Sequence, residues 1–308
     1  MEGLRSRTAF FAAVVCFLFG AVPAHGQLSE KQSWAVTLAG QYAINANLTY
    51  ATANNVELKL DVYRPRDMNV HPTVMFFHGG GMVGGAKEGA AFAILPFLEK
   101  GWTVVNVEYR LAKISRAPAS IEDGRCALRW VYQNAKMYNF DTSRIVTMGQ
   151  SAGGNLALML GYLPANSDFD RQCNGTEDLK VAAVLDWYGV TDWNDLLEGA
   201  NQRNYAMTWF GSQPDRQQIA KTASPLTYIR AGLPPTLMIQ GNEDPNVPFT
   251  HSLRLQKALN DAKVPNQLVT IQAKTHGNFN DAAMNDAYTQ LWAFLAKYVP
   301  GQQLQSNK

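Results

Sequence analysis

The stretch Met148-Gly149-Gln150-Ser151-Ala152-Gly153-Gly154 follows a short apolar run that begins at Ile145 and leads into a helix-like segment that ends at Leu160. It matches the Gly-x-Ser-x-Gly pattern, in which a serine lies on a sharp turn between a strand and a helix. The glycines at positions 149 and 153 tolerate the backbone angles and close approach that such a turn needs. The pattern predicts that Ser151 is a nucleophile. Clusters of glycine and serine also occur in ordinary turns, so the rest of the chain must distinguish these two interpretations.

The composition of the 308-residue chain favours a folded domain with a large core. Its hydrophobic content of 46% excludes disordered and fibrous classes of protein. The formal net charge of +2 arises from nearly balanced acids and bases without a basic block. This charge pattern predicts no nucleic-acid partner and no strong attraction to anionic membranes. We therefore expect a neutral or small partner, and the oligomeric state stays open.

The first residues have the pattern of a secretory signal peptide. Arg5 and Arg7 precede an apolar run at residues 9–22, and small residues occupy positions 24 and 26. The alternative is a membrane anchor, but the run of about 14 residues is shorter than the roughly 20 that a spanning helix needs. We predict cleavage after Gly26, which leaves residues 27–308 as a secreted or periplasmic protein without stable membrane association.

Cys16 lies within the predicted signal peptide, so the mature chain would keep two cysteines, Cys126 and Cys173. Two cysteines in an exported protein permit one disulfide. The alternative is a pair of separate buried thiols.

The chain reads as one α/β domain, without repeats or a linker. Residues 56–63 alternate apolar and polar side chains and end at Arg64-Pro65, which predicts a hairpin strand at a sheet edge. Short apolar runs typical of strands buried on both faces follow at 73–77, 102–107, 145–148, 181–185, 236–239 and 267–271. Helical patterns lie at 88–100, 121–138, 250–262 and 281–298. This alternation predicts a mostly parallel sheet, whose sites form beyond the carboxyl ends of the strands.

One connection is much longer than the others. The alternation lapses between Asp186 and Pro234, and we treat residues 187–233 as an insertion or cap. Its aromatic residues are Trp187, Tyr188, Trp193, Tyr205, Trp209 and Phe210. Long excursions in compact domains are often functional covers. The alternative is that the rings only pack the insertion onto the sheet.

A glycine-rich turn, His78-Gly79-Gly80-Gly81, directly follows the strand at 73–77. Bare backbone N–H groups in such a turn can donate to a developing oxyanion, and the N–H of Ala152 would add a further donor. A phosphate-binding loop is the alternative, but the lysine and Ser/Thr of that motif are missing. We expect His78 to form a hydrogen bond within this loop.

Asp244 and His276 each follow a predicted strand, so both should lie at the same sheet edge as Ser151. The chain order Ser, Asp, His is that of the α/β-hydrolases. Glu243 is the rival acid; Asp244 is preferred because the Asp-x-x-Val-Pro pattern places its carboxylate at the turn before the next helix.

These motifs together resemble those of hormone-sensitive-lipase-like esterases, and most closely a secreted bacterial branch that removes acetyl or feruloyl groups from xylan. The matching motifs are Leu60-Asp61-Val62-Tyr63-Arg64-Pro65, His78-Gly79-Gly80-Gly81, Tyr109-Arg110-Leu111, Pro118-Ala119 with Asp123, Gly149 to Gly154, Asp244-Pro245 with Val247-Pro248, and His276-Gly277. They extend over about residues 45 to 298. The resemblance implies an α/β-hydrolase fold with helices on both faces of a mostly parallel sheet and an insertion after the sixth strand.

The resemblance also implies a mechanism. His276 would accept the proton of Ser151 as the serine attacks an ester, Asp244 would hold the imidazole, and Gly80, Gly81 and Ala152 would bind the oxyanion. No metal or organic cofactor is implied. The substrate would be a small-molecule or polysaccharide-linked ester.

The sequence also departs from this family. Gln150 replaces the usual Asp, Met82 replaces a frequent Trp, and Lys113-Ile114 replaces Pro-Glu. We predict that Met82, Gln150, Trp187 and Tyr188 contact the substrate. A general carboxylesterase, a lipase, a peptidase or amidase, and an inactive binding protein stay open as alternatives.

Overall fold

The computed structural model describes residues 28–173 and 175–300. The predicted signal peptide and its cleavage point lie outside these residues. The chain divides into two units, residues 1–37 and 38–308. The described part of the first unit consists mainly of the first turns of helix α1 (Glu30–Gln41).

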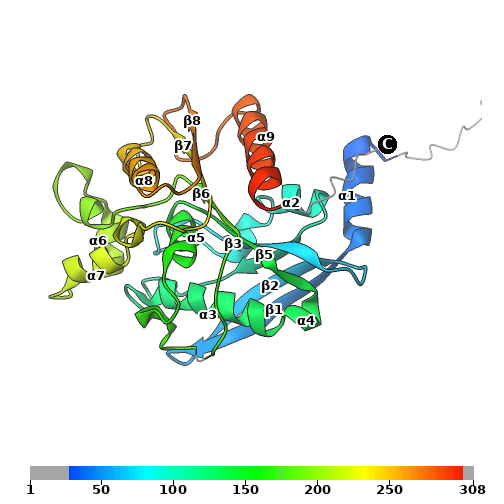
Figure 1. Cartoon of the computed structure of the whole chain (residues 1–308), viewed down its shortest axis with the longest axis horizontal. Helices are drawn as coiled ribbons and strands as arrows, with labels where there is room; N and C mark the ends of the chain where they lie inside the picture. Colours follow the sequence, from blue (N-terminus) through cyan, green and yellow to red (C-terminus); the bar gives the residue numbers. More distant parts are fainter. Residues whose placement is uncertain (1–27, 174, 301–308) are drawn as a thin grey trace, which may run out of the picture. The chain divides into compact units, whose positions relative to one another are not determined.

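The second unit contains an eight-stranded sheet in the order β1-β2-β4-β3-β5-β6-β7-β8 (Figure 1). The strands are β1 (Tyr42–Ala53), β2 (Val56–Pro65), β3 (His71–Phe77), β4 (Thr103–Val107), β5 (Phe140–Gln150), β6 (Ala183–Trp187), β7 (Thr236–Gly241) and β8 (Asn266–Ile271). The hairpin of β1 and β2 pairs antiparallel to β4, and the pairs from β4 through β8 are all parallel. The predicted mostly parallel sheet is confirmed.

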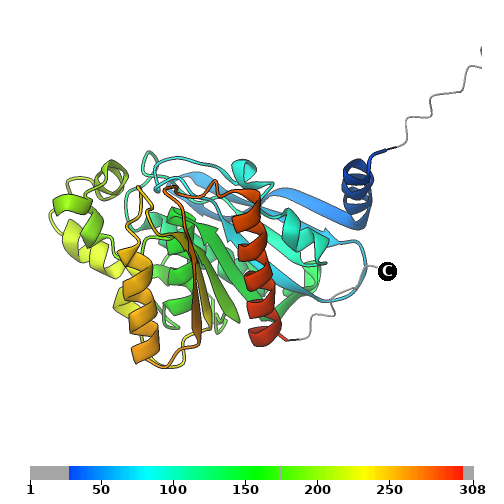
Figure 2. The ribbon, with the colours of Figure 1, turned by 90° about the horizontal axis from the view of Figure 1, so that it is seen from above.

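Helices cover both faces of this sheet. The α-helices of the second unit are α2 (Leu95–Glu99), α3 (Ala119–Gln133), α4 (Ala135–Tyr138), α5 (Ala152–Tyr162), α6 (Asn204–Phe210), α7 (Arg216–Thr222), α8 (Thr250–Asp261) and α9 (Asp281–Tyr298). Figure 2 shows α8 and α9 on opposite sides of the strands. On β3, Met75 and Phe77 belong to the core that includes α3 and α5, while Val74 and Phe76 belong to the core that includes α2 and α9. This alternation explains why the strand is apolar at nearly every position.

The sheet register aligns the carboxyl ends of the central strands. Phe77 pairs with Gly149, and Gln150 pairs with Trp187, which in turn pairs with Ile239. Because these strands are parallel, the loops that follow them leave the sheet at one edge. This edge therefore brings together segments that are far apart in the sequence.

The insertion between β6 and β7 packs around a small aromatic cluster. Besides α6 and α7 it contains the 3-10 helices η3 (Asn194–Leu196), η4 (Gly199–Asn201) and η5 (Pro225–Tyr228). Trp193, Trp209 and Phe210 are fully buried. The ring centroids of Trp193 and Trp209 lie 4.8 Å apart, and those of Trp209 and Phe210 lie 4.7 Å apart. These three rings hold the insertion together and pack it onto the core.

Several elements differ from those expected, and the helix expected at 121–138 is divided into α3 and α4. The helix expected at 88–100 is divided into the 3-10 helix η1 (Lys87–Ala90) and the short α2. Pro96 explains the second boundary, because proline lacks an N–H and fits only the first turn of a helix. Strand β1 was not predicted. It occupies the edge of the sheet, and β2 lies between β1 and β4, so the prediction that residues 56–63 form an edge strand was wrong. Leu48 and Ala51 of β1 pair with Leu60 and Leu58 of β2.

Cys126 of α3 and Cys173 are joined in a disulfide, with 5.4 Å between their Cα atoms. Cys173 follows the 3-10 helix η2 (Asp168–Asp170). The bond ties the loop after α5 to α3 across a sequence separation of 47 residues. The disulfide, rather than two separate thiols, is therefore the state that the structure shows.

Candidate active site

Ser151 lies on a strained turn between β5 and α5. Its backbone has φ 56° and ψ −118°, and its N–H donates to the carbonyl of Trp187 at 2.9 Å. A Cβ on Gly149 would lie 2.1 Å from the Gly153 oxygen, and a Cβ on Gly153 would lie 2.1 Å from the Phe77 oxygen. Both positions therefore require glycine, which is the physical reason for the Gly-x-Ser-x-Gly pattern. The turn exposes the serine hydroxyl at the carboxyl edge of the sheet.

The structure brings Ser151, His276 and Asp244 together. His276 Nε2 lies 2.7 Å from Ser151 Oγ, and His276 Nδ1 lies 2.7 Å from Asp244 Oδ2. The carboxylate of Asp244 can only accept, so Nδ1 donates and Nε2 is free to accept the serine proton. The other oxygen of Asp244 accepts from the N–H groups of Asn246 and Val247, at 2.8 and 3.0 Å. These bonds hold the carboxylate in the plane that orients the imidazole.

Three backbone N–H groups near Ser151 are available as donors. Gly80 and Gly81 have φ of 125° and 63°, and the Gly80 carbonyl accepts from the N–H groups of Val83 and Gly84 at 3.0 Å. Ala152 is the first residue of α5. Within residues 28–173 and 175–300, the N–H groups of Gly80, Gly81 and Ala152 donate to no acceptor. Free N–H groups next to a helix N-terminus suit a developing negative charge.

His78 stabilises the glycine loop from behind. Its Nδ1 donates to the Gly79 carbonyl at 2.7 Å, as expected for a bond within the loop. The ring stacks on Tyr109 at 4.3 Å, and burial lowers the pKa of His78. The Tyr109 hydroxyl donates to the His78 carbonyl at 2.8 Å. A neutral, buried His78 therefore shapes the loop and does not line the site.

Two of the four residues predicted to contact substrate lie in the core instead. Met82 is fully buried, and Trp187 is 2% exposed with its ring 5.4 Å from that of Tyr288 on α9. Neither side chain is accessible to a substrate. Trp187 is the last residue of β6, so the alternation of side chains along the strand directs its ring to the α9 face. Met82 has φ 62°, and its side chain joins the core beside α3 and α5.

The other two lie closer to the nucleophile. Gln150 is half-buried and directly precedes Ser151. Tyr188 packs edge-on against the ring of His276, with 4.7 Å between centroids. Its N–H donates to the Ile239 carbonyl at 2.8 Å, and burial raises the pKa of its hydroxyl. Tyr188 therefore supports the imidazole from the side of the insertion.

Asp186 is a buried carboxyl that the sequence patterns did not single out. Its Oδ1 accepts from the Gly189 N–H at 2.9 Å, while Oδ2 has no partner among the described residues. Burial raises the pKa of Asp186 to about 7. A Cβ on Gly154 would lie 2.4 Å from Oδ1, so the carboxyl lies directly beside the helix that starts at the nucleophile. The sequence feature that could have pointed to Asp186 is its position as a single polar residue directly after the apolar run at 181–185.

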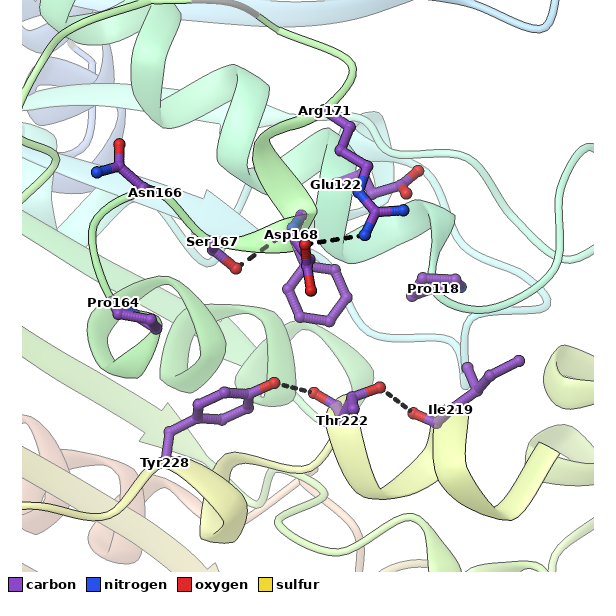
Figure 3. A pocket seen from close by; sticks show the side chains of 11 residues that line it. Pro118, Glu122, Pro164, Asn166, Ser167, Asp168, Arg171, Ile219, Thr222 and Tyr228 are labelled. Carbon is purple, nitrogen blue, oxygen red and sulfur yellow. Dashed lines mark hydrogen bonds and ion pairs between the residues drawn. The ribbon is translucent and has the colours of Figure 1, made fainter. Parts of the chain in front are cut away.

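A separate cavity of about 520 Å³ lies away from these groups (Figure 3). It lies between the loop after α5 and the insertion, and none of the three residues Ser151, Asp244 and His276 lines it. Its lining residues are Pro118, Glu122, Pro164, Asn166, Ser167, Asp168, Phe169, Arg171, Ile219, Thr222 and Tyr228. Several of the polar groups are already engaged, such as the Tyr228 hydroxyl, which donates to the Thr222 carbonyl at 2.7 Å.

The described residues also lack the features of two other kinds of site. No cluster of three or more His, Cys, Asp or Glu side chains within them has the arrangement of a metal site. In the same part of the chain, no helix combines the length and apolar character needed to cross a membrane.

Several known proteins with similar sequences are described as esterases. The chain is 30% identical over 199 residues to the esterase LipC of Mycobacterium tuberculosis, covering 61% of this chain and 49% of that protein. It is 41% identical over 189 residues to the carboxylesterase NlhH of the same organism, covering 56% of each. The chain thus spans about half the length of the curated relatives it matches.

Solved structures show the same fold. A thermophilic esterase of Thermogutta terrifontis matches with a TM-score of 0.71 at 26% identity, over 87% of this chain and 95% of that one. A bifunctional GH43-CE protein of Bacteroides eggerthii matches with a TM-score of 0.69 at 26% identity, over 82% of this chain and 38% of that one. The model of the BD-FAE family matches residues 60–259. The chain therefore belongs to the BD-FAE family and has an α/β-hydrolase fold.

Proposed function

We propose that the protein is a secreted serine carboxylesterase that hydrolyses its substrate through an acyl-enzyme. The observation that carries this proposal is the continuous chain of contacts from Ser151 Oγ through His276 to Asp244, with both joining distances at 2.7 Å. A serine hydroxyl is a weak nucleophile until a base accepts its proton, and this geometry supplies that base. The esterase relatives support the same reaction.

The proposed reaction has two halves. Ser151 Oγ attacks the ester carbonyl while its proton passes to His276 Nε2, and the oxyanion is bound by the N–H groups of Gly80, Gly81 and Ala152. His276 then protonates the departing alcohol as the carbon–oxygen bond breaks. In the second half, water gives a proton to His276, attacks the acyl-enzyme and releases the carboxylic acid, and the proton returns to Ser151. Asp244 stabilises the imidazolium in both halves.

We propose acetyl or feruloyl esters on a plant polysaccharide such as xylan as the substrate. A structural relative from Bacteroides eggerthii, a bifunctional GH43-CE protein, supports a carbohydrate-linked ester.

A general short-chain carboxylesterase is the second candidate. Structures of the Thermogutta terrifontis esterase are described as propionate-bound and butyrate-bound, at 25% identity to this chain. Both candidates use the same proposed catalytic residues and differ in the acyl group and the alcohol of the ester.

We also propose that the protein is exported, with residues 1–26 as its signal. The disulfide between Cys126 and Cys173 supports this proposal, because such bonds persist in oxidising compartments.

Hydrolysis of p-nitrophenyl acetate tests the reaction. We expect Ser151→Ala to lower kcat by at least about 10⁴-fold, as expected when a nucleophile is lost. Ser212→Ala removes an exposed hydroxyl of the insertion and is the matched control, with activity equal to that of the wild type. Activity of Ser151→Ala close to that of the wild type would refute the proposal.

Acetylated xylan, methyl ferulate and p-nitrophenyl acetate, compared under one set of conditions, separate the two substrate candidates. The carbohydrate proposal predicts that kcat/KM is highest for acetylated xylan or methyl ferulate. Efficient hydrolysis of p-nitrophenyl acetate with neither of the other two would favour the short-chain carboxylesterase.

A further inference from the structure

Tyr205 of α6 rests directly on the glycine loop beside the nucleophile. A Cβ on Gly81 would lie 2.7 Å from Tyr205 Cβ, 2.8 Å from Cγ and 3.1 Å from Cδ2. Any side chain at position 81 would therefore collide with this tyrosine. The contact places a residue of the insertion next to one of the proposed oxyanion donors.

The same tyrosine is bonded to the loop that carries Asp244. Its hydroxyl donates to the Asn246 carbonyl at 3.1 Å. Arg203 reaches the same loop, with Nε donating to the Asn246 carbonyl at 3.0 Å and Nη2 to the Pro245 carbonyl at 3.2 Å. The beginning of α6 thus bridges the glycine loop after β3 and the acid loop after β7.

The ring of Tyr205 also has a rigid support behind it. It meets Trp193 edge-on, with 6.3 Å between centroids, and Trp193 is packed against Trp209 and Phe210. Tyr205 itself is partly exposed, and burial raises the pKa of its hydroxyl. A partly exposed ring fixed at both ends and backed by a buried cluster is a wall that a substrate cannot easily displace.

We infer that Tyr205 determines specificity by limiting the length of the acyl group that the site accepts. The inference rests on the proposed esterase function. His276 must protonate the leaving alcohol, so the alcohol lies on the side of the histidine. The oxyanion must face the N–H groups of Gly80 and Gly81, and Tyr205 rests on Gly81. The proposal therefore places the acyl group on the side of the carbonyl that faces away from His276, against the ring of Tyr205.

The test compares kcat/KM for p-nitrophenyl octanoate and p-nitrophenyl acetate in the wild type and in Tyr205→Ala. We expect the octanoate-to-acetate ratio to rise at least tenfold in the variant, because each methylene that gains a buried surface contributes roughly fourfold. Tyr205→Phe retains the ring and should keep the wild-type ratio. Tyr228→Ala removes a tyrosine of the same insertion that lines the separate cavity, and should also keep it.

Active-site titration with a fluorophosphonate and thermal unfolding show how much of each variant is folded. Tyr205→Leu provides a second, better-packed variant, for which we expect a ratio between those of the wild type and Tyr205→Ala. A series of alkyl acetates with alcohols of increasing length should show the same profile in all variants.

An octanoate-to-acetate ratio that stays within twofold of the wild-type ratio in both Tyr205→Ala and Tyr205→Leu would overturn the inference. So would a change in kcat/KM that is seen only across the series of alkyl acetates with different alcohols. Either result leaves the esterase proposal intact. That proposal fails separately if the wild type shows no Ser151-dependent hydrolysis of any of these esters.

Discussion

The loops at the carboxyl edge of the sheet, which carry the proposed catalytic residues, and the insertion between β6 and β7 meet at Tyr205, but they are built differently. The turn around Ser151 is fixed by backbone geometry, since Gly149 and Gly153 leave no room for a Cβ. The insertion is fixed by large side chains, with Trp193, Trp209 and Phe210 as its core. Backbone geometry therefore fixes the loops that carry the proposed reacting groups, whereas side-chain packing fixes the insertion.

This difference separates chemistry from selectivity. A glycine that a close contact requires can be replaced by few other residues. The glycines that flank Ser151 therefore form a pattern that can be recognised in the sequence. An aromatic cluster can be rebuilt from other residues of similar volume. Substitutions in the two regions should therefore have different effects.

The largest effect is expected within the catalytic loops. Asp244→Asn retains the shape of the side chain but removes the charge that holds the imidazole tautomer, so kcat should fall by about 10⁴-fold with an unchanged fold. The neighbouring Glu243, which pairs with Lys274 at 2.8 Å on the surface, provides the control. Glu243→Gln should change kcat by less than about twofold, since an exposed ion pair contributes little. Steady-state hydrolysis of p-nitrophenyl acetate by both variants checks this; the reverse order would identify Glu243 as the acid.

The next effect is expected within the insertion and concerns stability. Trp209 is fully buried, so Trp209→Ala should lower the free energy of unfolding by about 3–5 kcal/mol. Phe92 is 85% exposed, and Phe92→Ala should change the free energy of unfolding by less than about 0.5 kcal/mol. Urea unfolding measures both. With p-nitrophenyl acetate, kcat per folded molecule should stay within about tenfold in Trp209→Ala; a loss as large as that of Asp244→Asn would show that the insertion takes part in the chemistry.

A smaller and pH-dependent effect is expected where the two regions join, at Asp186. Burial raises its pKa from 3.8 to about 7, so between these values the native state binds a proton that the unfolded state has released. Stability must therefore fall as pH rises from about 4 to about 7, by at most about 4 kcal/mol from this group. The amide in Asp186→Asn cannot ionise, so the stability of this variant should depend less on pH.

Urea unfolding at pH 5 and pH 8 compares the wild type with Asp186→Asn. The exposed Asp215→Asn is the control and should retain the wild-type dependence. If the free energy of unfolding changes between pH 5 and pH 8 by the same amount in the wild type and in Asp186→Asn, this carboxyl is not neutral in the native protein.

Much of the fold follows from sequence patterns, because apolar runs with short connections leave few arrangements. Helix α9 has the predicted bounds, and β3 and β8 contain their predicted runs. Strand β1 was missed because Tyr42–Ala53 is mostly half-buried or exposed and lacks an apolar run. Its place is set by pairing with β2, a long-range contact that local patterns do not encode.

In the candidate site, too, sequence patterns predicted some features and missed others. Ser151, Asp244 and His276 were predicted because each follows a strand end, and the structure brings them together. Met82 and Trp187 were misplaced because a position next to a motif does not fix the direction of a side chain. The contact of Tyr205 with Gly81 depends on how the insertion folds back, and nothing in the spacing of the two residues predicts it.

The most direct test of the account is covalent labelling by a fluorophosphonate probe, followed by intact-mass measurement and peptide mapping. We predict one adduct per chain, on the peptide that contains Ser151, with no labelling of Ser151→Ala and labelling slowed at least about 100-fold in His276→Ala. Labelling of Ser151→Ala at the wild-type rate, or an adduct on a different residue of the wild type, would contradict the account.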